Sequence, residues 1–204
     1  MRSTVEEVKC RASYIYPEYT RKPVAGSFSG YERELKGVLQ GEPDSLRRYR
    51  KYAKTPEELS LLRSIEERPF LVVRAAGSQG FDLVALRDRV ILPIEVKSSG
   101  QPRIPFASSS GRSQEQYVSL RAQTRRSGLL LLYGYRLIGG GERDPWRFFR
   151  VETPIEDHNP YSRMIAAQLP PVGATNQGNQ VLRWEEGKPL LEFLNWVHSV
   201  LLGT

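Results

Sequence analysis

The chain has 204 residues, of which 39% are apolar and 26% are charged, and its formal net charge is +7. This length and composition suit one globular domain with or without extensions, and the positive charge favours a polyanionic partner. One cysteine excludes an intrachain disulfide framework and, with only two histidines, a zinc finger. We find no signal peptide and no apolar run near the about 18 residues of a membrane helix, so we expect a cytoplasmic protein without membrane contact.

Residues 1–28 are predicted to form an N-terminal extension, because tyrosines, basic residues and prolines alternate there without a helical or strand period. We favour an irregular tail laid on the domain over an arm that stacks on unpaired bases. Ser29 and Glu32 then have the spacing of a capping box and predict the start of a helix. Glu32 either caps this helix or serves a catalytic purpose, since one side-chain conformation does not meet both roles.

A second helix is predicted over Leu46–Lys54, where five of nine residues are basic and none is acidic. Helical spacing would gather Arg47, Arg50, Lys51 and Lys54 on one face. This face is either a surface that contacts phosphates or an ordinary solvated helix face. We predict a DNA-contacting surface here, away from the catalytic residues.

A third helix is predicted to begin at Thr55, because Thr55 and Glu58 have capping-box spacing and Pro56 occupies the first helical position. It should end before Pro69, since the residue ahead of a proline is disfavoured in a helix. Residues 41–68 would therefore form a helical segment ahead of the first strand.

Three short apolar runs in the middle of the chain predict three buried strands. The second and third flank Arg87-Asp88-Arg89, which is the length of a hairpin connection. In such a hairpin Asp82 and Glu95 come level on adjacent strands. Side chains alternate faces along a strand, so Glu95 and Lys97 share one face.

Two carboxylates and a lysine in an otherwise apolar hairpin cost several kcal/mol per ion unless they are paired or bind a metal. Carboxylate oxygens suit Mg²⁺ or Mn²⁺, and a nearby ammonium can orient a water or stabilise charge on a scissile phosphate. The alternative is a surface hairpin with an ordinary Glu–Lys pair.

Pro93 has no N–H to donate to a neighbouring strand. We therefore expect a bulge at Pro93 that directs the side chain of Glu95.

The rest of the chain is predicted to complete the sheet and cover it. The C-terminal helix either closes the core or pairs with a second subunit. In chain order we expect a loop over 98–113, a helix over 113–126 with Tyr117, Leu120 and Thr124 inward, strands over 128–138 and 146–151, a long loop over 154–180, a short strand over 181–184 and an amphipathic helix over 189–202.

The stretch Val-Val-Arg-Ala-Ala-Gly-Ser, the following Asp82-Leu-Val-Ala, and Ile-Glu95-Val-Lys97-Ser-Ser together resemble the archaeal-type Holliday junction resolvases of the restriction-endonuclease-like superfamily. An earlier Glu32-Arg33-Glu-Leu resembles the first-helix motif of that family. The resemblance implies an α/β fold, in which helices flank a central mixed β-sheet. It covers about residues 29–40 and 69–150, and it leads us to expect a nuclease domain over 29–153 with an inserted helical segment over about 41–68, and a region 154–204 that packs on the same domain or at a dimer interface.

The resemblance also implies site residues. An ungapped alignment places Glu58 where the first-helix acid belongs, but it loses the following arginine, so we prefer Glu32 and keep Glu58 as its rival. The implied assignments are Glu32, Asp82, Glu95 and Lys97 as catalytic residues, Glu32, Asp82 and Glu95 as ligands of Mg²⁺ or Mn²⁺, and Arg33, Arg74 and Ser78 as DNA contacts, to which the basic helix adds Arg47, Arg50 and Lys51.

The implied function is a metal-dependent, structure-selective DNA endonuclease that resolves four-way junctions. A homodimer is implied as well, and it suits this substrate because twofold symmetry places two sites on two opposed strands. Two alternatives stay open: another repair-type or sequence-specific nuclease of the same superfamily, and a non-catalytic junction-binding protein.

Overall fold

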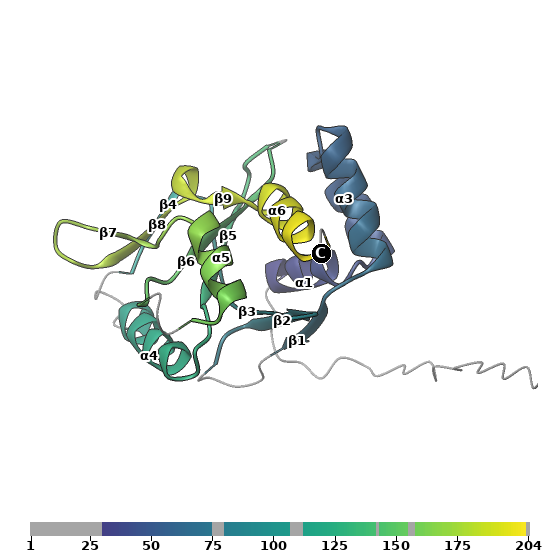
Figure 1. Cartoon of the computed structure of the whole chain (residues 1–204). Helices are drawn as coiled ribbons and strands as arrows, with labels where there is room; N and C mark the ends of the chain where they lie inside the picture. The colour runs from purple at the N-terminus through teal and green to yellow at the C-terminus, as the bar shows by residue number, and fades with distance from the viewer. Residues whose placement is uncertain (1–29, 75–79, 107–111, 142, 155–157, 203–204) are drawn as a thin grey trace, which may run out of the picture.

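The structure, a computed structural model, describes residues 30–74, 80–106, 112–141, 143–154 and 158–202. Its centre is a six-stranded sheet with the strand order β1-β2-β3-β5-β6-β9 (Figure 1). Strands β3 and β5 are parallel, and the other neighbours are antiparallel. The predicted α/β fold with a central mixed sheet is confirmed. The strands are β1 (Leu71–Arg74), β2 (Leu83–Arg87), β3 (Val90–Ser99), β5 (Leu132–Leu137), β6 (Trp146–Arg150) and β9 (Lys188–Pro189).

Helix α4 (Arg112–Arg126) connects the two parallel strands. Parallel neighbours need such a crossover, because the chain must return across a face of the sheet. As predicted, Tyr117, Leu120 and Thr124 are buried, and the two apolar side chains belong to a core shared with strand β5. Helix α4 therefore covers the face of β5 that continues from Glu95 and Lys97.

A second, three-stranded sheet has the order β4-β8-β7. It brings β4 (Arg103–Pro105) next to β8 (Gln180–Arg183), and β7 (Gly173–Ala174) pairs on the other side of β8. The expectation of a plain loop over 98–113 is therefore wrong at β4, because its partner strand lies far ahead in the sequence.

The segment before the sheet is helical, as predicted. The capping box of the third helix is present: the Thr55 hydroxyl accepts from the backbone N–H of Glu58, and the Glu58 carboxylate accepts from the N–H of Thr55. The predicted cap of the first helix lies outside the described residues. The helical elements are α1 (Gly30–Leu39), α2 (Pro43–Tyr49), the 3₁₀ turn η1 (Arg50–Tyr52) and α3 (Pro56–Glu67).

Two apolar cores lie against the central sheet. The larger joins the N-terminal helices and the C-terminal helices to side chains such as Ala85 and Ile94 on one face of the sheet. The smaller joins α4 and the three-stranded sheet to side chains such as Tyr133 and Phe149 on the other face. Alternation along β3 assigns Ile94 to the first face and Glu95 to the second. The candidate site therefore lies on the face that α4 partly covers.

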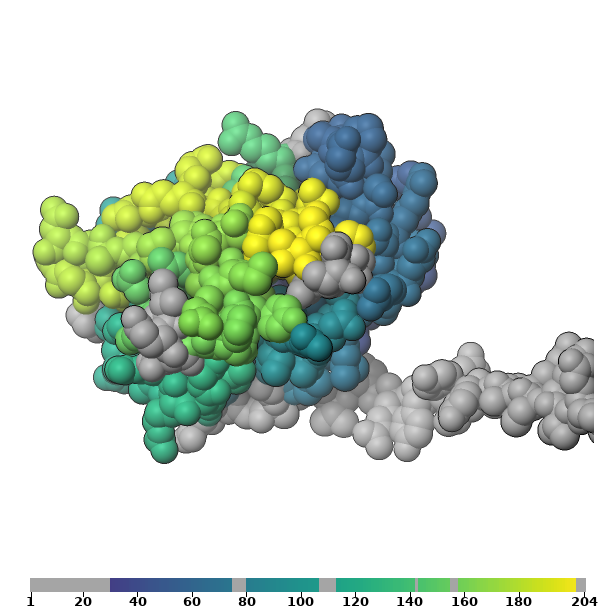
Figure 2. Space-filling view, in the orientation of Figure 1, coloured from purple at the N-terminus to yellow at the C-terminus, as the bar shows by residue number. Residues whose placement is uncertain are grey.

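The C-terminal region contains a helix that we did not predict. Helix α5 (Pro160–Gln168) occupies much of the expected loop over 154–180; Asn159 caps it by accepting from the N–H of Ser162, and proline fills its first position. Helix α6 (Leu190–Leu202) closes the larger core and contacts α3. Figure 2 shows yellow α6 between green α5 and blue α3.

No helix among the described residues is long and apolar enough to span a membrane.

Candidate active site

The hairpin of β2 and β3 positions the two predicted carboxylates. Leu83, the first residue of β2, pairs with Ile94 in the antiparallel register. Asp82 precedes Leu83 and Glu95 follows Ile94, so the two acids lie next to each other where β2 begins. A backbone contact fixes Asp82, since its Oδ2 accepts from the N–H of Val96 at 2.7 Å. The predicted juxtaposition of the two acids is present in the structure.

The bulge expected at Pro93 is wrong. The register is regular through this residue, with Val84 opposite Pro93 and Leu83 opposite Ile94. Alternate pairs of an antiparallel ladder exchange both hydrogen bonds or none, and counting from the two-residue turn places Pro93 in a pair that exchanges none. Strand β5 begins to pair with β3 only at Ile94. Pro93 therefore removes no hydrogen bond from the sheet. The regular alternation of side chains along β3 directs Glu95 to the face of the candidate site.

Glu95 lies at the centre of the polar contacts, with a side chain only 2% exposed. Its Oε1 accepts from Lys97 Nζ at 2.8 Å and from Gln116 Nε2 at 2.8 Å. Lys97 Nζ also donates to Gln116 Oε1 at 3.1 Å. The three side chains therefore form a closed triangle that fixes both the carboxylate and the ammonium.

Gln116 is a site residue that we did not predict. Gln116 stands in the first part of α4. The sequence of this segment predicts a helix but no site residue, because glutamine is common on solvated helix faces. It reaches the site because α4 crosses over the end of β3, a contact between residues 21 positions apart. The available signal was its place one residue before the inward-facing Tyr117.

Burial raises the pKa of Glu95 from its ordinary value of 4.5 to about 6. Nearby Lys97 opposes this shift, and the negative charge of Asp82 adds to it. A bound cation strongly stabilises the ionised form of a carboxylate whose pKa is raised by burial.

The donor set of the site fits a hard divalent cation. The second carboxylate oxygen of Glu95, Oε2, is buried and has no hydrogen-bond partner among the described residues. A buried, unpaired carboxylate oxygen is costly, and Asp82 supplies further oxygen next to it. Within the described part of the chain, no group of three or more His, Cys, Asp or Glu side chains is arranged to hold a metal ion. Glu95 and Asp82 are therefore the two candidate protein ligands here.

Tyr133 forms the buried floor beside the carboxylates. It pairs with Glu95 across the parallel strands, and its side chain is fully buried. Its hydroxyl has no hydrogen-bond partner within the described ranges. Burial, followed by the charge of Glu95, raises the pKa of this phenol, so it stays protonated and keeps a proton to donate.

The two rivals for the first-helix acid differ in their surroundings. Glu58 caps α3, where its Oε2 accepts from the N–H groups of Lys54 and Thr55 at 2.6 and 3.1 Å. Glu32 is half-buried on α1, which contacts β1, β2 and β3, whereas α3 contacts α2 and α6. The cap occupies Glu58, so we keep Glu32 as the predicted third catalytic acid. Its predicted role as a metal ligand is wrong for this structure, because Glu32, Asp82 and Glu95 do not form one group that could hold an ion.

The predicted DNA contacts are spread over several elements. Arg33 on α1 and Arg74 at the end of β1 are exposed, and Ser78 lies outside the described residues. The basic face expected on the second helix is divided. Arg47 and Arg50 line one hollow and Lys51 lines another, because α2 ends at Tyr49 and the chain continues as a tighter 3₁₀ turn.

Two acids and a lysine on adjacent strands of a mixed sheet match the site predicted for a phosphodiester-cleaving nuclease. The family model of the archaeal Holliday junction resolvases, Hjc, matches residues 49–161, more than half of the chain. The chain belongs to the archaeal Holliday junction resolvase (Hjc) family. The matched range contains Asp82, Glu95, Lys97 and Glu58, and it begins after Glu32.

One solved structure that resembles the chain is that of Archaeoglobus fulgidus Hjc, described as a Holliday junction resolvase from an archaeal hyperthermophile. Sequence identity to it is 21%, and the match covers 72% of this chain and 95% of that chain with a TM-score of 0.40. No curated protein matches the chain.

Proposed function

We propose that this protein is a metal-dependent endonuclease that resolves four-way DNA junctions. The observation that carries the proposal is the state of Glu95: one oxygen holds two donors, and the other is buried and unpaired next to Asp82. Such a carboxylate is prepared for a cation, and Mg²⁺ is the hard ion that suits oxygen ligands beside a phosphate, with Mn²⁺ as a substitute.

Each side chain then has a separate role. Asp82 and Glu95 would hold the ion, which supplies charge neutralisation at the scissile phosphate and a more acidic water when bound. Lys97 donates to Glu95 and Gln116 and is 22% exposed, so its ammonium can also face a phosphate or the attacking water. Gln116 keeps Oε1 of Glu95 engaged and thereby leaves Oε2 for the ion. We propose Glu32 as a third acid.

We propose a homodimer, which the resolvase resemblance implies and which suits the symmetry of a junction. An exposed apolar strip on β1 and β3 supports a contact with a second copy. Leu71, Val73 and Ile91 are 65%, 49% and 39% exposed. They lie on the outer strand β1 and on β3, on the same face as Glu95. An exposed apolar strip on an edge strand favours association.

The test is cleavage of a four-way junction by the wild-type protein with Mg²⁺ and with chelator. Symmetric incisions that need Mg²⁺ are expected, and a tenfold excess of linear duplex should compete poorly. Strong competition by duplex would favour a repair-type or sequence-specific nuclease. Tight junction binding without cutting in Mg²⁺ or Mn²⁺ would favour a non-catalytic junction-binding protein. The cytoplasmic location stays a prediction.

A further inference from the structure

A hollow of about 550 Å³ opens between helix α1 and the segment formed by α2 and η1. Four cationic side chains line it: Arg33 on α1, Arg48 on α2, Lys51 on η1 and Arg136 on β5. Two acids line it too, Glu34 and Glu42. Arg136 forms an ion pair with Glu34, and the cations that the inserted segment brings to the hollow are Arg48 and Lys51.

Within the described ranges, a hydroxyl and an aromatic ring, and no acid, hold the two cations of the inserted segment. Arg48 is exposed and donates to the hydroxyl of Ser45. Lys51 is exposed, and its Nζ lies 4.8 Å from the ring centre of Tyr52. A hydroxyl and a ring position these side chains and leave their charge in place. Charge of this kind attracts an anion.

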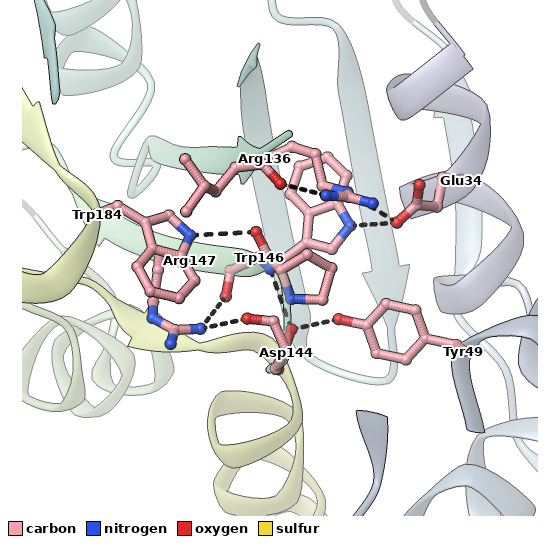
Figure 3. A network of polar contacts seen from close by, with 9 residues as sticks. Glu34, Tyr49, Arg136, Asp144, Trp146, Arg147 and Trp184 are labelled. Carbon is pink, nitrogen blue, oxygen red and sulfur yellow. Dashed lines mark hydrogen bonds and ion pairs between the residues drawn. The ribbon is translucent and has the colours of Figure 1, made fainter. Parts of the chain in front are cut away.

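A network of polar contacts ties the wall of the hollow to the rest of the fold (Figure 3). The Tyr49 hydroxyl donates to Asp144, which also accepts from the backbone N–H groups of Trp146 and Leu191. These contacts tie α2 to the central sheet and to α6. On the other side, Glu34 accepts from Arg136 and from the indole of Trp146. The hollow is therefore built before any ligand arrives, which lowers the entropic cost of binding.

The hollow lies close to the candidate active site along the same two strands. Arg136 pairs with Ser98, and Ser98 follows Lys97 directly. Ser98 stands three positions after Glu95, which is about 10 Å along the strand at 3.3 Å per residue. The side chains of Ser98 and Arg136 point to the opposite face from Glu95, so site and hollow lie on either side of β3 and β5.

We propose that this hollow binds a backbone phosphate of the DNA substrate, a few nucleotides from the scissile one. The proposal rests on the proposed function, because it assigns the hollow to the strand that enters the active site. Phosphate is the group that a cluster of arginine and lysine at the edge of a nuclease site would hold, and such contacts set orientation without selecting sequence. Arg48 and Lys51, supplied by the inserted helices, are the residues that make this site.

The experiment compares two double variants that each remove two positive charges from the surface of the protein. Arg48→Gln with Lys51→Gln removes the two cations that the inserted segment brings to the hollow. Arg63→Gln with Arg163→Gln removes two exposed cations, on α3 and α5, that do not line it. The probe is a fluorescent four-way junction, titrated in chelator at several salt concentrations. Both variants keep the buried contacts of Tyr49 and Tyr52, so melting temperatures near the wild type confirm the fold.

The first variant should bind about tenfold more weakly than the wild type and lower the slope of log K against log salt by about 1 to 2. The second should change both by clearly less. The cleavage rate of the second variant in Mg²⁺ should stay near the wild-type rate, because neither of its side chains lines the hollow. Wild-type affinity in the first variant, or equal losses in both, would overturn the assignment. Failure of the wild type to cut would reject the proposed function and leave this binding comparison intact.

Discussion

Gln116 and Lys97 both donate to the same oxygen of Glu95, and each donor nitrogen lies 2.8 Å from it. Side chains that orient a metal-ligating carboxylate affect metal affinity by about 10- to 100-fold. We therefore expect Gln116→Ala to raise the Mg²⁺ concentration needed for half-maximal cleavage by about tenfold or more. At saturating Mg²⁺ much of the rate should return, because Asp82, Glu95 and Lys97 remain.

Gln123→Ala is the matched control, since Gln123 is exposed on the same helix. It should leave the Mg²⁺ dependence unchanged. A Gln116→Ala protein with a wild-type Mg²⁺ curve would show that the triangle of contacts does not prepare the carboxylate.

Glu95 should make the metal-free protein less stable at neutral pH. Its folded pKa of about 6 lies above its ordinary 4.5, so the folded state binds this proton more tightly than the unfolded state. The stability that the protonated Glu95 contributes to the folded state is complete below pH 4.5 and is lost as the pH rises through 6. A shift of this size corresponds to about 2 kcal/mol.

Glu95→Gln should therefore raise the free energy of unfolding at pH 8 in chelator, by up to about 2 kcal/mol, and the gain should shrink toward pH 4.5. Urea denaturation of both proteins across this range measures it. Added Mg²⁺ should stabilise the wild type and not the variant. A Glu95→Gln protein that is less stable than the wild type at pH 8 in chelator would contradict the raised pKa of Glu95.

The exposed apolar strip on β1 and β3 gives a prediction about assembly. Leu71→Asp with Val73→Asp should convert a dimer into a monomer in light scattering, because two charges would be buried in the contact. Ile138→Asp, at a residue of comparable exposure at 43%, should leave the mass unchanged. A wild-type protein that is monomeric at high micromolar concentration would reject the proposed dimer.

Local sequence signals predicted much of the fold. The hairpin followed from apolar runs around a charged turn, and the capping box of α3 is present at Thr55 and Glu58. Asp82 and Glu95 came level because a hairpin register is fixed by its turn. These features depend on residues that are close in the sequence.

The errors have two physical origins. Helix α5 had its signals, an asparagine cap at Asn159 and the proline after it, but surrounding polar residues hid its short apolar stripe. Strand β4 and the contact of Gln116 with Glu95 depend on partners far away in the chain. The path of α4 across the sheet, and not any local pattern, brings Gln116 to the site.

The most direct test of the account is single-turnover cleavage of a four-way junction by Asp82→Asn, measured beside its binding affinity. The substitution keeps an oxygen that accepts from Val96 and removes the charge that would hold the ion. We expect cleavage in Mg²⁺ to fall by at least about 100-fold, with junction affinity in chelator within about threefold of the wild type. Cleavage at the wild-type rate, or equal loss of binding and cleavage, would contradict the proposed metal site at Asp82 and Glu95.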